Sequence, residues 1–305
     1  RRHTRFRNVT GVQTCALPIS KIVCTLGPAV ASDAQISELI SAGMNVARLN
    51  LSHGDHQEHQ ARLNAVRNAA EKAKQSVAIL VDLQGPKIRL GKFVAGPHLL
   101  NIGDILTITT DEIQGTKEIV GTTYKGLPGD CKAGDLLLID DGRVVVQVVE
   151  VTKNSVKTKC IEPGEISNNK GINLPGVAVS VPAMSDKDEA DLRWGLRAGA
   201  DLIALSFVRT ADDIIAVHRI MDEMGIRKPV IAKIEKPQAV ENLDSIIETF
   251  DGVMVARGDL GVEMPIEEIP LVQKRCITIA REKADRKSTR LNSSHVSESR
   301  MPSSA

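Results

Sequence analysis

The sequence lacks several features that would assign it to a particular class of protein. No stretch reaches the roughly 20 apolar residues that a membrane-spanning helix requires, so no membrane partner is expected. Its 39 basic and 38 acidic residues nearly cancel, to a formal net charge of +1, which argues against a general attraction to nucleic acid or to a membrane surface. Any affinity for phosphate must therefore be local.

Paired cysteines are also missing. The five cysteines form no CxxC pair and are scattered along the chain, at Cys15, Cys24, Cys131, Cys160 and Cys276. An odd, scattered set indicates reduced thiols, so we expect a cytoplasmic protein without disulfides. The apolar run CALPI near the amino terminus is followed at once by strand-forming sequence, which argues against a signal peptide.

What the chain does have is an alternation of apolar strands and amphipathic helices. Its 305 residues, 42% of them hydrophobic, suffice for one large domain or two smaller ones. Strands are expected at 21–26, 44–49, 77–82, 202–206, 230–234 and 252–256, and helices starting at Ser32 or Asp33, near Asp55, at Ser185, near Ala211 and at Ile266. This α/β alternation favours a parallel sheet, and converging polar strand ends favour a (β/α) barrel of the TIM type.

Residues 88–173 interrupt the alternation. They contain short strands of alternating polarity with Gly, Asp and Asn at the turns, and DDGRV at 140–144 is typical of a hairpin turn. We therefore expect an all-β insertion in the barrel.

The segment VMVARGDLGVE at 253–263 is the most informative in the chain. An apolar strand there runs directly into Arg257, Gly258 and Asp259. A glycine turn at a strand end aims backbone N–H groups at an anion, and the nearby carboxylate can hold a metal. This junction predicts phosphate chemistry.

A second charged strand end is VIAKIEKP at 230–237. Side chains alternate faces along a strand, so Lys233 and Glu235 offer a cation and an anion together. Taken alone, such a pair is more often a solvated face. The apolar residues before it and the glycine turn of the following strand favour a functional site.

In a third segment, MNVARLNLSHG at 44–54, Arg48, Asn50 and Ser52 share one strand face, and the opposite face is apolar. The downstream histidines are expected to be solvated, because HGDHQEH lacks the compact ligand set of a zinc site.

The fourth segment, VAILVDLQGPKIRLG at 77–91, is a buried-type strand that ends at Asp82 and turns toward Lys87 and Arg89. A turn or helix-capping role is the alternative for Asp82.

With NNKGINLPG at 168–176, these segments closely resemble the pyruvate kinase family, over roughly residues 20–285. Several long motifs agree in order and spacing, which is far more specific than one glycine motif. The resemblance implies an incomplete TIM-type barrel with a small β-barrel lid inserted after its third strand. It also implies transfer of a phosphoryl group from phosphoenolpyruvate to ADP, giving pyruvate and ATP in glycolysis.

The resemblance further implies roles for individual residues. Lys233 would be the catalytic residue that neutralises the migrating phosphoryl group, and Glu235 and Asp259 would bind Mg²⁺. The remaining substrate contacts would come from the side chain of Arg48 and the amides of Arg257, Gly258 and Asp259. The nucleotide contacts would come from Arg89, Lys170 and His53. Because Arg89 and Lys170 then lie at its hinges, the insertion is favoured as a lid over a separate β module.

The potassium site is where this chain departs from the common family pattern. Asn50, Ser52 and Asp82 match the family's K⁺ ligands, whereas Leu83 could offer only its carbonyl group. Lys87 stands where a glutamate is usual, and its ammonium could take the electrostatic place of the bound cation. We expect weak or absent dependence on K⁺.

The expected domains are a non-native flank at 1–19, barrel segments at 20–87 and 174–286, the lid at 88–173 and a non-native disordered tail at 287–305. The family's last two barrel strands and its C-terminal domain would be missing, so low stability and low activity are expected. Full-length members of the family are expected to be homotetramers, and the oligomeric state of this chain stays open.

Two other functions remain as alternatives. One is a barrel lyase or mutase that uses Mg²⁺ to stabilise the enolate of a keto acid. It would share the metal pair but would not need the lid, Arg89 or Lys170. The other is a non-catalytic fragment that binds phosphate.

Overall fold

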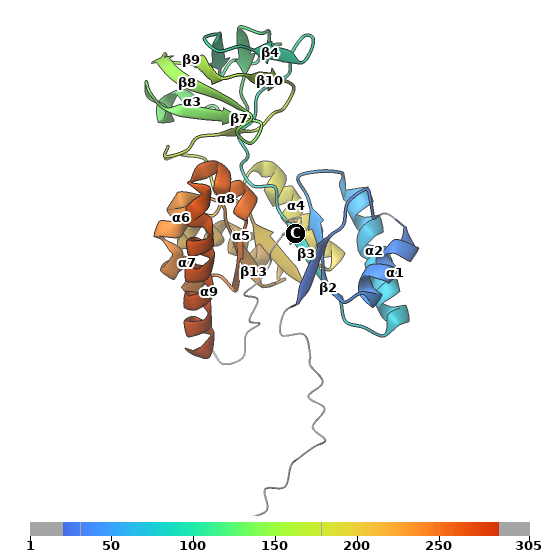
Figure 1. Cartoon of the computed structure of the whole chain (residues 1–305). Coiled ribbons are helices and arrows are strands. Elements are labelled where there is room, and N and C mark those ends of the chain that lie inside the picture. The colour runs from blue at the N-terminus through green and yellow to red at the C-terminus, as the bar shows by residue number, and fades with distance from the viewer. Residues whose placement is uncertain (1–20, 31, 178, 287–305) are drawn as a thin grey trace, which may run out of the picture.

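The computed structural model of the chain describes residues 21–30, 32–177 and 179–286. The flanks predicted at 1–19 and 287–305 lie outside the described residues. Two bodies are evident: a lower α/β body, and an upper β body joined to it by two extended connections (Figure 1).

The lower body is built on one parallel sheet of six strands. In sheet order these are β1 (Ile22–Thr25), β2 (Met44–Asn50), β3 (Ala78–Asp82), β12 (Leu202–Leu205), β13 (Val230–Ile234) and β14 (Gly252–Val255). Each of these strands begins and ends within one residue of its predicted range. The strands are continuous apolar runs because the sheet is covered, with helices outside and a small cluster of Leu80, Ala204, Ile231 and Met254 inside.

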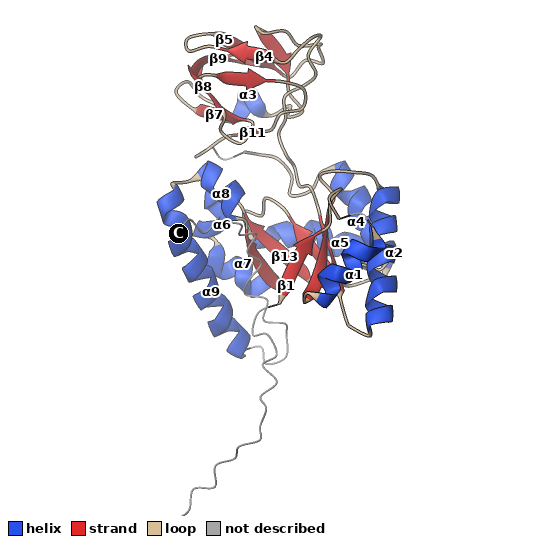
Figure 2. Cartoon of the chain, turned by 45° about the vertical axis from the view of Figure 1, so that its right-hand side comes forward, coloured by secondary structure: helices blue, strands red, loops and turns tan. Residues whose placement is uncertain are grey.

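Helices lie to the left and right of the curled sheet in Figure 2, around its outer face. They are α1 (Asp33–Ser41), α2 (His56–Ala73), α4 (Asp186–Ala198), α5 (Ile214–Met224), α6 (Pro237–Glu241), α7 (Leu243–Thr249), α8 (Arg257–Glu263) and α9 (Ile269–Arg286), with 3₁₀ turns at Ala211–Asp213 and Ile266–Glu268. Side-chain caps at Ser32, Asp55 and Ser185 start three of them, as the sequence predicts. No helix in the described part of the chain is both long and apolar enough to cross a membrane.

The upper body has its own sheets. One contains β11 (Ile172–Asn173), β7 (Leu136–Ile139), β8 (Val144–Val151), β9 (Ser155–Glu162), β5 (Ile105–Thr109) and β6 (Ile119–Gly121), and the other pairs β4 (His98–Leu100) with β10 (Gly164–Ile166). A short helix, α3, spans Leu127–Asp130. We call this body the lid.

The predicted hairpin at 140–144 is confirmed. Strands β7 and β8 pair antiparallel around it, with Ile139 opposite Val144. Its turn residues Asp140, Asp141 and Gly142 all have positive φ, a conformation that short polar residues and glycine tolerate best.

Candidate active site

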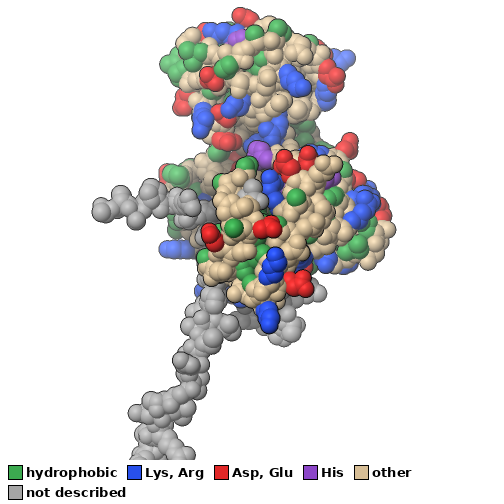
Figure 3. Space-filling view, turned by 90° about the vertical axis from the view of Figure 1, so that its right-hand side faces the viewer, with side chains coloured by type: hydrophobic (Ala, Val, Ile, Leu, Met, Phe, Trp, Pro, Cys, Tyr) green, Lys and Arg blue, Asp and Glu red, His purple; other side chains and the backbone are tan. Residues whose placement is uncertain are grey.

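A cavity of about 320 Å³ opens where the lid meets the carboxyl ends of the parallel strands. Lysine and arginine side chains gather at this narrow junction (Figure 3). Of the residues predicted for the site, the cavity is lined by Arg48, Asn50, Ser52, His53, Lys87, Arg89, Lys170, Lys233, Glu235 and Asp259. The structure therefore brings the four predicted segments and the lid hinge together.

Lys233 and Glu235 form the charged centre of the site. The Lys233 Nζ lies 2.7 Å from Glu235 Oε1 and 3.4 Å from Asp82 Oδ1, and it donates to Ser206 Oγ at 2.8 Å. Burial opposes the charged form of Lys233, but the Glu235 and Asp82 carboxylates outweigh it and raise the pKa of the ammonium. Lys233 is therefore a fixed cation at neutral pH.

Glu235 and Asp259 come from neighbouring strands, since β13 pairs with β14 and α8 follows β14 directly. Glu235 is only 1% exposed, and its Oε2 accepts the backbone N–H of Phe207 at 2.7 Å. Burial is the largest cause and raises the pKa of Glu235. The positive charge of Lys233 lowers it and the negative charge of Asp259 raises it, and the net result is a raised pKa. Asp259 is therefore near enough for its charge to act on Glu235, and a pair of neighbouring carboxylates is suited to hold a cation.

Arg48 is held on the other side of the same cluster. Its Nε donates to Asp82 Oδ2 at 2.6 Å and its NH1 group donates to Thr25 Oγ1 at 2.8 Å. Asp82 is wholly buried and bridges Arg48 to Lys233, so it acts as an ion-pair partner and the turn or helix-capping alternative is wrong.

The predicted potassium ligands divide into two groups. Asn50 and Ser52 line the cavity, while Asp82 and Leu83 lie buried behind it. The Leu83 carbonyl accepts the Ser206 hydroxyl at 2.7 Å. Lys87 lines the same cavity, but its nearest anionic partner is Asp141 of the lid, at 3.7 Å.

Two of the predicted nucleotide contacts lie at the lid side of the cavity. Lys170 Nζ pairs with Asp140 at 2.9 Å, and an NH1 group of Arg89 donates to the Asn169 carbonyl at 2.9 Å. An isolated bridge between Arg89 and Gly171 joins the two connections to the lid. His53, in the barrel loop between β2 and α2, also lines the cavity.

Arg257 and Gly258 occupy the first turn of α8, next to Asp259. Asp259 lines the cavity, whereas Arg257 and Gly258 are not among its lining residues. The contact predicted from their main-chain amides to a bound anion stays a prediction.

Two further residues of the site were missed by the sequence analysis. Ser206 and Phe207 follow β12 directly, and Ser206 receives the Lys233 ammonium while the N–H of Phe207 binds Glu235. Phe207 has φ = +56°, a strained conformation for an aromatic residue that is typical of functional sites. A search for a polar residue at the end of each apolar strand, as made for the other strands, would have found Ser206 and, next to it, Phe207.

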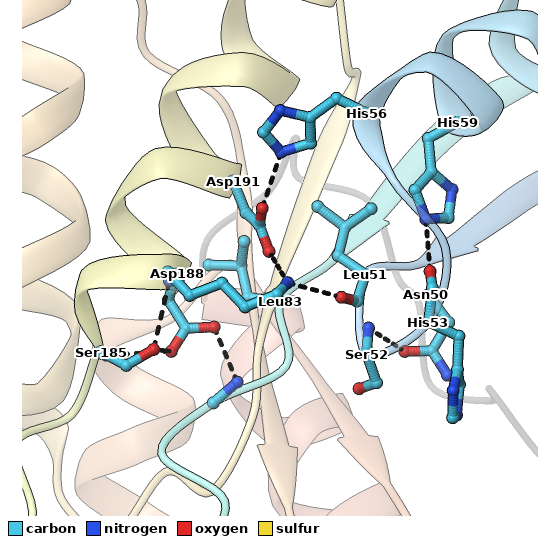
Figure 4. A network of polar contacts seen from close by, with 12 residues as sticks. Asn50, Leu51, Ser52, His53, His56, His59, Leu83, Ser185, Asp188 and Asp191 are labelled. Atoms are coloured by element: carbon cyan, nitrogen blue, oxygen red, sulfur yellow. Dashed lines mark hydrogen bonds and ion pairs between the residues drawn. The ribbon is translucent and has the colours of Figure 1, made fainter.

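The amino-terminal half of α4 supports the loops that carry the site (Figure 4). The buried Asp188 accepts the N–H of Gly85 at 2.8 Å, and Lys187 donates to the Leu51 carbonyl at 2.7 Å. Lys187 also pairs with Asp191, which contacts His56 at 2.7 Å. These contacts fix both loops relative to the barrel.

The histidines of α2 differ from expectation in one respect. His59 is 2% exposed and its Nε2 contacts the His53 carbonyl, so the expectation of a solvated side chain is wrong for this residue. His56 stacks on Trp194. In the described part of the chain no group of three or more His, Cys, Asp or Glu residues could hold a metal by itself.

Comparisons with known proteins show the family to which the chain is similar. Residues 17–296 match the family model described as the pyruvate kinase barrel domain. Curated pyruvate kinases from Corynebacterium glutamicum and Mycobacterium tuberculosis are 58% and 51% identical over 87% of this chain. The solved structure of a pyruvate kinase from Cryptosporidium parvum superposes with a TM-score of 0.80 at 40% identity, over 85% of this chain and 55% of that one.

The chain spans 56% of the length of the two curated relatives. The predicted fold class, an incomplete barrel with an inserted β domain, is confirmed by the match to the barrel model and by the solved relative. On the extent and identity of these matches, the chain belongs to the pyruvate kinase family.

Proposed function

We propose that this chain carries the catalytic centre for transfer of a phosphoryl group from phosphoenolpyruvate to ADP, giving pyruvate and ATP. The observation that supports this most directly is the buried Lys233 ammonium, which lies 2.7 Å from Glu235 and lines the same cavity as the lid cations Arg89 and Lys170. Phosphoryl transfer brings several anions together, so it needs fixed cations more than it needs a nucleophile.

Mg²⁺ fits the donor set. Mg²⁺ is usually held by one or two protein carboxylates and keeps its other positions for water and substrate oxygens, which matches the pair Glu235 and Asp259. When bound there, the ion would stabilise negative charge on the enolate oxygen of the substrate.

The side chains of the barrel would then orient phosphoenolpyruvate. Arg48 would bind its phosphate, and the main-chain amides at the start of α8 would bind its carboxylate. Lys233 would neutralise the oxygens of the phosphoryl group as it moves toward ADP, because its position between two carboxylates keeps it charged.

Arg89 and Lys170 of the lid, with His53 of the barrel, would bind the nucleotide phosphates. In this structure Lys170 and Arg89 contact Asp140 and Asn169 of the lid, so these partners must release them when phosphates enter. Closing the lid would exclude water and strengthen every charge interaction in the cavity.

We also propose that Lys87 makes the reaction largely independent of K⁺. Its charge lines the same cavity as Asn50 and Ser52, where a monovalent cation is expected in other members of the family. A cytoplasmic enzyme with reduced thiols fits the free Cys24, Cys131, Cys160 and Cys276.

The domain boundaries at 87/88 and 173/174 are likewise proposed. The lid core begins at Ile88, which supports the first boundary. The lid core also includes Leu174 and Val177, which lie past the second boundary, and the barrel core resumes with Met184. The exposed edges of β1 and β14 have no second neighbour within the described ranges, which supports the expectation of low stability and low activity for the isolated chain.

ADP-dependent pyruvate formation, followed with lactate dehydrogenase and NADH, tests the function. The assay is best applied both to the chain itself and to a chimera in which residues 20–286 replace the matching segment of the Corynebacterium glutamicum relative. We expect the chimera to be active and the isolated chain to be nearly inactive. Full turnover and a cooperative melt of the isolated chain would contradict the second expectation.

Two alternatives make different predictions in the same assay. A barrel lyase or mutase would need the metal pair but no ADP, and the cationic lid rim favours the kinase over it. A phosphate-binding fragment would bind ADP or phosphoenolpyruvate without forming pyruvate, even in the chimera.

A further inference from the structure

A buried polar contact ties the lid to the segments that carry the two candidate metal ligands. The Glu263 carboxylate accepts a hydrogen bond from Asn173 Nδ2 at 2.8 Å and pairs through the same oxygen with Lys236 Nζ at 2.5 Å. Asn173 is the last residue of β11 in the lid, and Glu263 is the last residue of α8. We call these three residues the hinge bridge.

The two barrel members of the bridge are joined to the active site along the chain. Lys236 directly follows Glu235, and α8 carries Asp259 one turn before Glu263. The Lys236 ammonium also lies 5.6 Å from the centre of the Phe207 ring, the residue whose N–H binds Glu235. The bridge therefore anchors the lid to the two barrel segments that carry Glu235 and Asp259.

The burial of Asn173 argues that the bridge is more than incidental. Its side chain is 9% exposed, and its amide oxygen has no hydrogen-bond partner among the residues that the structure describes. Burying an amide with half its hydrogen-bonding capacity unused is unfavourable, so the bond to Glu263 is the main polar gain of this position. The Glu263 side chain is 2% exposed and would be an uncompensated buried charge without Lys236.

We propose that Asn173 and Glu263 are positioning residues that set the angle of the lid on the barrel. The bridge would hold the rim cations Arg89 and Lys170 above Glu235 and Asp259, where the nucleotide meets the phosphoryl group. This inference rests on the proposed function for its kinetic consequence, but the bridge itself can be tested without activity.

The first test measures hydrogen exchange by mass spectrometry in the chain itself. We expect Asn173→Ala to speed amide exchange at 172–177 by about tenfold, because the lost bond is to a charged group. Asn154→Ala is the matched control, since Asn154 also donates to a carboxylate in the lid, Asp111, at 2.8 Å but far from the hinge. Unchanged exchange at 172–177 in Asn173→Ala would overturn the proposal.

The second test measures steady-state kinetics in the chimera. Asn173→Ala should raise KM for ADP by about tenfold, the loss expected for one charged hydrogen bond, and leave KM for phosphoenolpyruvate nearly unchanged. If Asn173 contributed only to stability, Asn173→Ala would lower the fraction of active enzyme and change the KM for neither substrate. That result would also overturn the proposal.

The variant Glu263→Gln tests the bridge through thermal stability, independently of Asn173→Ala. Alone it leaves the Lys236 ammonium buried without its carboxylate, so it should lower Tm more than the double variant Lys236→Met/Glu263→Gln. If the single and double variants melt alike, the two residues do not form a coupled bridge. A chimera with native residues that makes no pyruvate would refute the proposed function, whereas the exchange result would still decide the bridge.

Discussion

The lid and the barrel solve the problem of pairing their strands in different ways. The lid strands are mostly antiparallel, and short turns such as that at 140–144 join β7 to β8 and β8 to β9. Other lid strands pair across long stretches of chain, for example β5 with β9, where Ile105 lies opposite Lys159. The barrel strands are all parallel and joined through helices, and the six-stranded sheet ends at β1 and β14 in the described part of the chain. Part of the lid sheet can therefore form through tight turns alone, whereas every neighbouring pair in the barrel sheet requires a long connection.

The charges of the site follow the same division. Those of the barrel are buried and interlocked, as in the bridge of Asp82 between Arg48 and Lys233. The lid ion pairs are more exposed, for example Lys170 with Asp140 and Lys87 with Asp141. Buried charges are suited to hold a fixed geometry, and exposed pairs can exchange their partners for a ligand at small cost.

The largest effect should come from the barrel charges. In the chimera, Lys233→Met should lower kcat by about 10²–10³-fold, the size typical of a lost electrostatic contact to the transition state. Its matched control is Lys283→Met. Lys283 lies on the outer helix α9 and pairs with Glu248 of α7. Undiminished turnover in Lys233→Met, measured in the coupled assay, would remove the basis of the proposed mechanism.

Core substitutions should separate the stabilities of the two bodies. Leu137 in the lid and Leu243 in the barrel are both fully buried, and Leu→Ala at either should cost about 2–5 kcal/mol of unfolding free energy. Each body has its own optical probe, because the only tyrosine, Tyr124, is in the lid and the only tryptophan, Trp194, is in α4.

Urea titrations followed by fluorescence of the two residues should show Leu137→Ala shifting the Tyr124 transition and Leu243→Ala shifting the Trp194 transition. Coincident shifts of both probes in either variant would mean that the lid and the barrel unfold as one unit.

Sequence patterns were sufficient for the parallel strands and for the charged strand ends, because period-two alternation and parallel pairing together place Lys233, Glu235 and Asp259 at one edge. They were insufficient for side chains whose partners are remote. Asn173 and Glu263 are separated by 90 positions, and nothing local in either segment indicates the hydrogen bond between them. The burial of His59 was missed for the same reason, since a polar run does not reveal what packs over it.

An intermediate effect should come from the lid side of the cavity. In the chimera, Lys170→Met should raise KM for ADP by about tenfold and change KM for phosphoenolpyruvate little, because a phosphate contact by lysine is a charge-assisted one. Lys153→Met, in the exposed turn between β8 and β9, is the control for loss of a lid charge. An equal loss of affinity for both substrates would contradict the division of binding between the lid and the barrel.

The smallest effect concerns the cation at the boundary between the two bodies. With Lys87 in place, the chimera should respond little to replacing Na⁺ by K⁺ at constant ionic strength. Lys87→Glu would remove the fixed cation and set a second carboxylate near Asp141, so a bound K⁺ should then raise the rate several-fold. Lys92→Glu reverses an exposed charge on the lid side and should leave the K⁺ response unchanged. Strong stimulation of the native sequence by K⁺ would show that the Lys87 ammonium does not replace the ion, and that its contact with the lid carboxylate is its main role.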